Sequence, residues 1–478
     1  MALTCRGFFD PAMDALWRHP RDGMCLVDLL TDTSFARVNM DGESVEMMAL
    51  RPPSASDWVR FSKYARRVHT LDVISYTETT DLPLHWCAVL EHFPGIQALP
   101  RLRSVLWEWA PECNCSHAPL LITPPLRKLV VDGLDERGIA QLIDVLPGCS
   151  ETMEYLEIST RFLGEREPQL AEGLWQALAM LQRVGHLDIS LYSPKAFRHL
   201  ASLSNVKTLR LVIDSLDLED TRLPFPSLTS FDISAKTDMD AVAKLLRRMA
   251  LPALKHLNII YHIIHRGTVP LHRPTAAHVQ LVVQEVSKLT SLRSLTIKSS
   301  RPSSRDPVEA LDASVLAPLH ALRELETLDL SVLAFSLTAA DIEPMARSWP
   351  RMQCLRLYQS RALFGERPLR MLSLDDILPF ARLCPHLREL AVFLQLASET
   401  ELEKEWTTTH ANLRKLWVSD VSSPRCVHAV RLLAKNFPVV TVESFEDTRL
   451  DKVINGTIGR LVHGLYGARF DRGRDEEV

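Results

Sequence analysis

Leu254-Lys-His-Leu257-Asn-Ile259 is the stretch that decides the fold, with apolar residues at its first, fourth and sixth places. In an extended strand, residues two apart share a face, so Leu257 and Ile259 point together into a core while Asn258 points out. The pattern recurs along the chain. Its central apolar residue falls at Leu71, Val105, Leu129, Leu156, Leu187, Leu209, Phe231, Leu257, Leu295, Leu328, Leu355, Leu390 and Leu416, with a degenerate copy around Val439 and Val442.

The spacing of these copies is stronger evidence than the matches themselves. With 46% hydrophobic residues, three fixed apolar places coincide by chance about one time in ten. The steps between central residues run from 22 residues (Leu187 to Leu209) to 38 (Leu257 to Leu295), which indicates a repeat. Most gaps hold one amphipathic segment that ends at a proline or a polar turn. The predicted helices are Leu82–Phe93, Leu170–Leu181, Asp240–Leu251, His278–Leu289, Asp341–Trp349, Leu374–Cys384 and Arg425–Phe437.

These strand–helix units resemble leucine-rich repeats of the long, irregular kind, over roughly residues 65–445. The resemblance implies an α/β solenoid in which helices line a curved parallel sheet. The alternative is an ordinary α/β domain, whose strands are apolar on both faces and whose helices vary more in length. The Asn or Cys that the family places three residues after the last strand leucine is missing, so we expect no side-chain ladder along the turns and less uniform curvature. Those places hold Tyr76, Tyr192, Asp214, Lys236 and His262.

The outward places of the strands form the predicted client-binding surface on the concave face. The competing interpretation is that these places are polar only because they face water, as in any half-exposed strand. The functional interpretation is a recognition groove that is acidic in its first half and more aromatic towards the C-terminus, because Tyr, Trp and Arg dominate binding hot spots. The predicted residues are Asp72, Glu157, Asp188, Arg210, Asp232, Asn258, Asp329, Arg356, Tyr358 and Trp417.

The first residues predict two short helices. Asp10 followed by Pro11 is a helix start, because a capping carboxylate precedes a proline at the first helical place. Met13, Leu16 and Trp17 then form one apolar stripe. A separate apolar helix over Leu3–Phe8 is expected before that start.

This segment resembles the C-terminal half of an F-box, in which a helix with a leucine, a cysteine, a basic residue and an aromatic is followed by a helix ending in Leu-Trp. The resemblance implies that the segment docks on the Skp-family adaptor of a cullin–RING ubiquitin ligase while the repeats capture an unknown protein client. The family's opening Leu-Pro helix has no counterpart in the sequence, so either adaptor binding is lost or the sequence starts within the motif. The alternative role is a cap helix for the solenoid of a scaffold protein. The adaptor-binding residues implied are Leu3, Cys5, Phe8, Phe9, Leu16 and Trp17, and Arg6 also matches the motif.

Composition and motifs argue against catalysis and against charged polymers as partners. The net charge of −4 gives no electrostatic reason to expect nucleic acid or a membrane as the main partner. We find no phosphate-binding glycine loop, metalloprotease helix or nucleophile elbow, and predict a non-enzyme with no catalytic residue and no cofactor. Cys113, Cys115 and His117 fall short of the four ligands that a closed zinc site needs, so a plain loop is expected. A GTPase-activating repeat protein is the least favoured alternative, because such proteins carry the asparagine ladder.

The nine cysteines are odd in number and mostly have apolar neighbours, which indicates reduced core thiols. With no secretory signal or membrane-spanning stretch evident, a cytoplasmic or nuclear protein is expected. The predicted organisation is an F-box-like segment over residues 1–30, a linker or cap over 31–64, the solenoid over 65–445, and a C-terminal cap and tail over 446–478.

Overall fold

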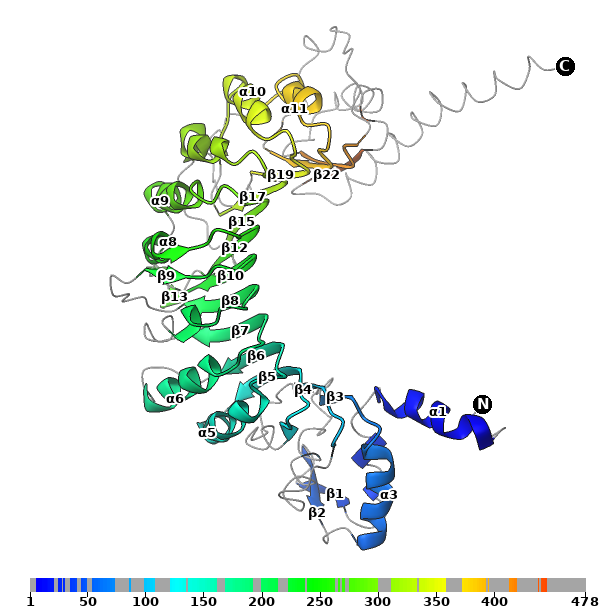
Figure 1. Cartoon of the computed structure of the whole chain (residues 1–478). Helices are drawn as coiled ribbons and strands as arrows, with labels where there is room; N and C mark the ends of the chain where they lie inside the picture. The colour runs from blue at the N-terminus through cyan, green and yellow to red at the C-terminus, as the bar shows by residue number, and fades with distance from the viewer. Residues whose placement is uncertain are drawn as a thin grey trace, which may run out of the picture. The chain divides into compact units, whose positions relative to one another are not determined.

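The computed structural model divides the chain into two compact units, unit 1 over Met1–Leu228 and unit 2 over Thr229–Val478. The fold class is α/β, as predicted (Figure 1). None of the helices in the described part of the chain is long and apolar enough to cross a bilayer. The residues that the structure describes are 6–20, 25–27, 29–30, 35–40, 44–49, 54–73, 86, 99–107, 121–134, 136–160, 168–191, 199–213, 222–236, 239–262, 265–266, 269–270, 275–299, 311–332, 335–357, 372–392, 394, 412–418, 437 and 440–444.

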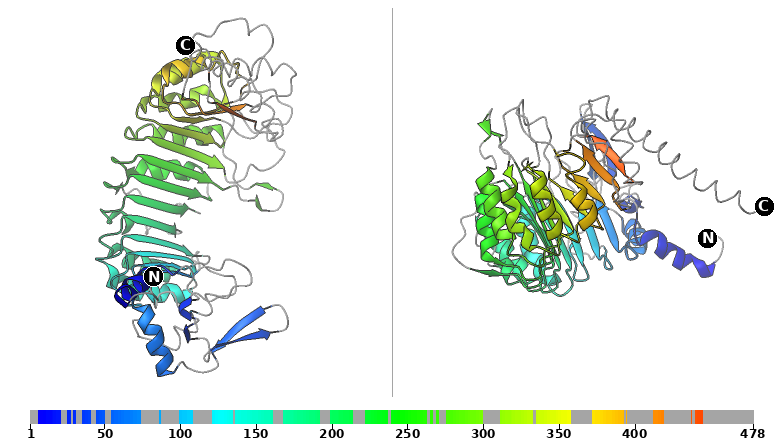
Figure 2. Two further views of the ribbon diagram at one scale, coloured as in Figure 1. Left: turned by 90° about the vertical axis from the view of Figure 1, so that its right-hand side faces the viewer. Right: turned by 90° about the horizontal axis from the view of Figure 1, so that it is seen from above.

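Each unit contains parallel strands that follow one another in chain order (Figure 2). In unit 1 these are β3 (Thr70–Val73), β4 (Ser104–Trp107), β5 (Lys128–Leu134), β6 (Tyr155–Thr160), β7 (His186–Leu191) and β8 (Thr208–Ile213). In unit 2 they are β10 (Ser230–Ala235), β12 (His256–Tyr261), β15 (Ser294–Ser299), β17 (Thr327–Ser331), β19 (Cys354–Arg356), β20 (Glu389–Ala391), β21 (Lys415–Val418) and β22 (Thr441–Ser444). Such an open succession of parallel strands is consistent with a solenoid.

The register of these strands confirms the predicted alignment. Leu156 pairs with Leu187, and Leu187 with Leu209, in unit 1. In unit 2, Leu257 pairs with Leu295, and Leu295 with Leu328. A slip of one residue would turn every buried leucine to solvent, so the period of two specifies the register. The remaining central residues pair in the same way from Leu71 to Leu156 and from Phe231 to Val442, apart from the step between the units.

Helices lie on one side of the strands within each unit (Figure 1). Unit 1 has α5 (Glu136–Val145), the 3-10 turn η2 (Leu146–Cys149) and α6 (Pro168–Ala179). Unit 2 has α8 (Met239–Arg248), α9 (Ala276–Val286), the 3-10 helix η3 (Ala313–Ala321), α10 (Ala339–Ser348) and α11 (Leu378–Leu383). Five of the predicted helices are therefore confirmed, with α11 shorter than expected, whereas Leu82–Phe93 and Arg425–Phe437 lie largely outside the described residues.

The core lies between the strands and these helices. Leu257 and Ile259 of β12 are buried, as are Val242 and Leu245 of α8 and Val282 of α9. Each such side chain stabilises the fold by roughly 1.5–3 kcal/mol, and the neighbouring repeat supplies part of its cover. The short strand pieces outside the main sheet are β9 (Leu223–Pro224), β11 (Met249–Ala250), β13 (His265–Arg266), β14 (Val269–Pro270), β16 (Leu311–Asp312) and β18 (Phe335–Ser336).

A main-chain carbonyl ladder runs along the beginning of the strands. The carbonyl of the residue just before each strand accepts two N–H groups from the next repeat, as His69 does from Arg103 (2.8 Å) and Ser104 (3.0 Å). The side-chain asparagine ladder is missing, but these main-chain bonds recur at each step within a unit. The accepting residues are Arg18, which follows α1 rather than preceding a strand, with His69, Arg103, Arg127, Glu154 and Gly185 in unit 1, and Thr229, Lys255, Arg293, Glu326, Gln353 and Arg388 in unit 2.

The region predicted as a linker or cap contains regular structure. Strands β1 (Phe35–Met40) and β2 (Ser44–Ala49) form an antiparallel hairpin. Helix α3 (Ala55–Ala65) starts with a capping box, in which the Ser54 hydroxyl accepts the Asp57 N–H and the Asp57 carboxylate accepts the Ser54 N–H.

The predicted helix break at Asp10–Pro11 is wrong, because one helix, α1 (Arg6–Trp17), runs through Pro11. Proline inside a helix costs about 3 kcal/mol, so the helix needs outside support there. Arg67 supplies it: this side chain is only 8% exposed and bonds Asp10 and Asp14, which lie on either side of the proline. Its guanidinium also donates to the Asp10 carbonyl at 3.1 Å. A residue that lies far along the chain thus overrides the local signal.

Acidification is expected to destabilise unit 2 through His320 of η3. This imidazole packs edge-on to Trp349 with 5.5 Å between ring centroids, and its buried Nε2 has no hydrogen-bond partner among the described residues. Burial lowers the pKa of His320 below 6.5, so the unfolded chain binds a proton that the folded chain does not. The contribution of His320 to the free energy of unfolding therefore has its full value above pH 6.5. It falls as the pH drops below 6.5, by no more than about 1.4 kcal/mol per pH unit.

Urea unfolding of the wild type and of His320→Leu at pH 7.5 and 5.5 checks this prediction. His69 and His262 also have lowered pKa values and contribute with the same sign in both proteins, so the difference between the two proteins isolates His320. Equal losses of stability on acidification would contradict the assignment.

Candidate functional site

The face of the sheet opposite the helices carries a line of paired charges in unit 2. Lys298 of β15 lies 3.0 Å from the Asp329 carboxylate of β17, and Arg356 of β19 lies 3.2 Å from the same group. Arg356 also lies 2.8 Å from Glu389 of β20, which accepts the indole N–H of Trp417 of β21 at 3.1 Å. We call these five residues the charge ladder. It joins five consecutive strands through side chains alone.

Asp329 was expected to face solvent, and the structure corrects this. It stands at an outward place of β17 but is only 2% exposed, because Lys298, Arg356 and the Ser331 hydroxyl surround its carboxylate. A partner on this face would contact Lys298 and Arg356 instead. Asp329 therefore positions the contacting groups without being accessible itself.

The charges of the ladder are firmly held. Burial works against the positive charge of Arg356, but Glu389 and Asp329 outweigh it and raise the pKa of this guanidinium. Burial, followed by the charge of Glu389, raises the pKa of the nearby Cys354 thiol to about 12. This thiol is therefore neutral at physiological pH and a poor nucleophile.

The equivalent face of unit 1 carries shorter polar groupings. Tyr155 of β6 stacks on His186 of β7 with 4.0 Å between ring centroids, and the Lys128 ammonium lies 4.6 Å from the other side of the ring. The Tyr155 hydroxyl donates to Glu157 at 3.0 Å. Burial, together with this hydrogen bond, raises the pKa of Tyr155 to about 12.

The predicted client-binding residues lie one to a strand, and they do not form a single cluster. Asp188 and Arg210 pair at 3.3 Å in unit 1, and Asn258 donates to Asp232 at 2.8 Å in unit 2. Sequence reasoning missed Glu389, which stands at the first place of its strand; the opposite charge of Arg356 in the preceding repeat was the available signal. The other predicted residues are Asp72, Glu157 and Trp417, which are half-buried, and Tyr358, which lies outside the described residues.

The predicted adaptor-binding residues fall into two stripes on α1. Phe8 and Leu16 are 61% and 64% exposed. Phe9 and Trp17 are half-buried against α3, with the Lys63 ammonium 5.9 Å from the Phe9 ring and Trp17 4.7 Å from the Tyr64 ring. Leu3 and Cys5 lie outside the described residues.

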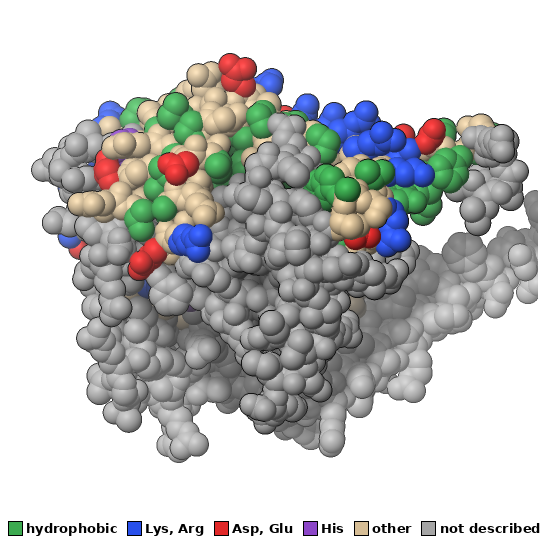
Figure 3. All heavy atoms as spheres, turned by 90° about the horizontal axis from the view of Figure 1, so that it is seen from below, with side chains coloured by type: hydrophobic (Ala, Val, Ile, Leu, Met, Phe, Trp, Pro, Cys, Tyr) green, Lys and Arg blue, Asp and Glu red, His purple; other side chains and the backbone are tan. Residues whose placement is uncertain are grey.

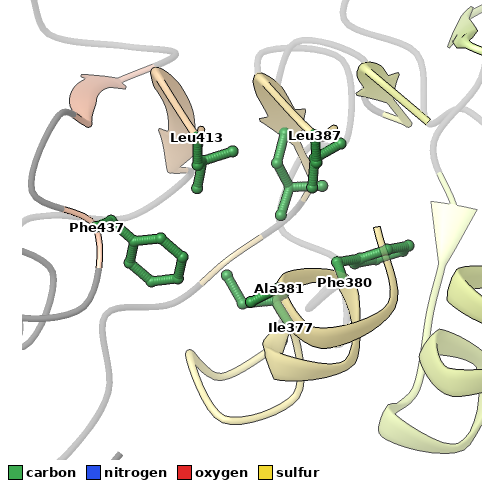
Figure 4. A pocket seen from close by; sticks show the side chains of 7 residues that line it. Ile377, Phe380, Ala381, Leu387, Leu413 and Phe437 are labelled. Atoms are coloured by element: carbon green, nitrogen blue, oxygen red, sulfur yellow. The ribbon is translucent and has the colours of Figure 1, made fainter. Parts of the chain in front are cut away.

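The described residues contain no cluster of side chains that could hold a metal ion. No group of three or more His, Cys, Asp or Glu side chains lies together in this part of the chain, and Cys113, Cys115 and His117 fall outside it. The four described cysteines, Cys25, Cys149, Cys354 and Cys384, are thiols that form no disulfide. One apolar cavity of about 10 Å³ lies between α11 and the strands β20 and β21, barely the size of one water molecule and without polar partners for it (Figure 4). It is lined by Ile377, Phe380, Ala381, Leu387, Leu390, Leu413 and Phe437.

Comparison of the sequence with protein-family models and with curated proteins finds no match. The case for a function therefore comes from the surfaces of the molecule itself. Two of them present side chains in a regular arrangement: the open face of the strands and the outer stripe of α1.

Proposed function

We propose that this chain is a leucine-rich-repeat protein that binds a client protein on the open face of its strands. We further propose that α1 docks on the Skp-family adaptor of a cullin–RING ubiquitin ligase, in the cytoplasm or nucleus. The observation that carries the proposal is the exposure of Phe8 and Leu16 on a helix whose opposite side is anchored. The client surface is supported by the charge ladder, where Arg356 and Trp417 are of the types that dominate binding hot spots.

The outer stripe of α1 has the form of a docking surface. Phe8, Ala12 and Leu16 follow one another at intervals of four, so they lie along one side of the helix. The neighbouring stripe, Phe9 to Trp17, already packs on α3. Large apolar side chains that stay exposed next to a packed stripe are typical of a surface that another protein covers.

The anchoring of α1 favours recognition, because a surface held in place loses little entropy on binding. Arg67 fixes the helix through Asp10 and Asp14, on the side away from Phe8. The chain after α1 is fixed as well, since the Arg18 carbonyl accepts the N–H groups of His69 (3.0 Å) and Thr70 (3.2 Å).

The same contacts favour a second candidate, a scaffold protein with no ubiquitin role. Trp17 is a residue of the F-box resemblance, yet its ring contacts Tyr64 within the chain, with 4.7 Å between ring centroids. The Arg18 carbonyl begins the main-chain ladder, so the end of α1 covers the first strand of the array. A terminal repeat needs such a cap whether or not an adaptor binds.

Phe8→Ala/Leu16→Ala is expected to abolish adaptor binding without unfolding the chain, because both side chains are mainly exposed. Each removed anchor costs about 2 kcal/mol, so affinity for the purified adaptor should fall at least a hundredfold. Val59→Ala and Met180→Ala are matched controls, since these apolar residues are 70% and 52% exposed elsewhere on unit 1. Trp17→Ala is less informative because it also removes the Tyr64 contact.

Gel filtration and calorimetry with the adaptor distinguish the two candidates. A complex with the intact chain and with both control variants, lost in the double variant, supports the ligase proposal. The absence of a complex with the intact chain contradicts it and leaves the scaffold candidate standing.

A further inference from the structure

The beginning of the strands in unit 1 carries a column of basic side chains. The residues whose carbonyls form the main-chain ladder follow one another from repeat to repeat, and the first four are Arg18, His69, Arg103 and Arg127. We call them the basic column. Figure 3 shows Lys and Arg side chains gathered beside hydrophobic ones at the end of unit 1 that carries α1.

The ladder sets the spacing of this column. Neighbouring parallel strands lie about 4.8 Å apart, so the four residues span about 14 Å. Arg101 lies two residues before Arg103, and Lys128 directly follows Arg127. Because the main chain makes the structural bonds of the ladder, the exposed side chains of Arg18, Arg101 and Arg103 are available for another role.

Most of the positive charge in the column has no strong ion-pair partner among the described residues. Arg18, Arg101 and Arg103 are exposed, and none forms an ion pair with a described residue. Arg127 pairs with Glu154 at 3.3 Å, but both side chains are more than half exposed, so this pair is weak. Burial first, and then the charges of Arg18, Arg103 and Arg101, lower the pKa of His69, so this side chain adds little positive charge at neutral pH.

Like charges at this spacing destabilise the folded chain unless an anion covers them. We propose that the basic column and Arg101 bind a short acidic segment of a protein partner, rich in Asp and Glu or phosphorylated on Ser or Thr. A stretch of four extended residues spans about 14 Å, which matches the column. This surface is additional to the adaptor and client surfaces proposed above, and the proposal does not rest on either.

Two observations favour an acidic protein segment over nucleic acid. The column ends at Glu154, the next residue of the ladder, so its positive strip is too short for the many phosphates of a polynucleotide. Both faces of the neighbouring Tyr155 ring are occupied, by Lys128 and His186, which leaves this aromatic unavailable for stacking on a base.

Fluorescence anisotropy with labelled peptides and the full chain tests the proposal. The probes are an extended peptide of about eight residues with alternating Glu and Asp, its Gln/Asn counterpart, its phosphoserine counterpart and an oligothymidylate of similar length. Binding of the acidic or phosphorylated peptide is expected, with the two probes showing which anion is preferred, and binding should weaken as salt rises from about 0.05 to 0.2 M.

Arg101→Gln/Arg103→Gln should weaken this binding about tenfold, since each exposed charge pair contributes up to about 1 kcal/mol. Arg101→Lys/Arg103→Lys should retain most of it, and Arg323→Gln, an exposed arginine of unit 2, should retain all of it. Phe8→Ala/Leu16→Ala should also bind normally, which separates this surface from adaptor docking. Equal binding of the Gln/Asn peptide, unchanged binding by the Gln variant, or stronger binding of the oligothymidylate than of either anionic peptide would overturn the proposal.

Discussion

Leu328→Ala and Leu257→Ala are each expected to lower the free energy of unfolding by about 2–5 kcal/mol. Both residues are fully buried or nearly so, at 0% and 1% exposed. Each stands at the central place of its strand, where Leu257 pairs with Leu295 and Leu328 pairs with Leu295 and Leu355. Truncation leaves a cavity that two neighbouring repeats line, and parallel strands at fixed spacing cannot move together to fill it.

The urea midpoint, followed by circular dichroism, measures this effect. Thr296→Ala is the matched control, because Thr296 directly follows Leu295 in β15 and faces away from the core. We expect its effect to stay within about 0.5 kcal/mol. Midpoints for the leucine variants that match the wild type would show that these leucines do not form the core of the array.

Asp329→Asn is expected to destabilise unit 2 by about 1–3 kcal/mol, because the buried carboxylate accepts charge-assisted hydrogen bonds from Lys298 and Arg356 that a neutral amide replaces only in part. The amide keeps the size of the side chain but removes the charge that holds Lys298 and Arg356. Arg356 retains Glu389, so its side chain should remain near β20 while Lys298 is released. If Lys298 and Arg356 contact the client, the same variant should also weaken client binding.

Asp72→Asn provides the comparison for this variant. Asp72 occupies the equivalent place of β3 but is only half-buried, so its loss of charge should cost less than about 0.5 kcal/mol. Urea unfolding of both variants at pH 7.5 gives the two values. Similar small effects would mean that the charge ladder contributes nothing to stability.

The alignment of the strands followed from the sequence because local and repeated signals agreed. A period of two within each strand recurs from repeat to repeat, and the gaps between strands are long enough for a helix, which five times ends at a proline. The structure therefore pairs Leu257 with Leu295 and Leu295 with Leu328, as predicted. The outward places were predictable for the same reason, since they alternate with the buried ones.

The details of the surfaces could not be predicted in this way. The helix break at Pro11 was wrong because Arg67, far along the chain, bonds both sides of the proline. The sequence correctly placed Asp329 on the outward face of its strand. Its burial could not be predicted, because it depends on Lys298 and Arg356 from the preceding and following repeats. Glu389 was missed because it stands at the first place of β20, before the central leucine, whereas the predicted residues stand after it.

The sequence by itself determined where the strands of the repeats lie, which face of each is buried and how consecutive ones align, because these depend on apolar periodicity that repeats at short range. Only the tertiary structure decided which charges meet, which aromatic rings stack and which side chains of α1 stay exposed. The reason is that these depend on contacts between repeats, where side chains about 4.8 Å apart in space come from positions tens of residues apart in the chain.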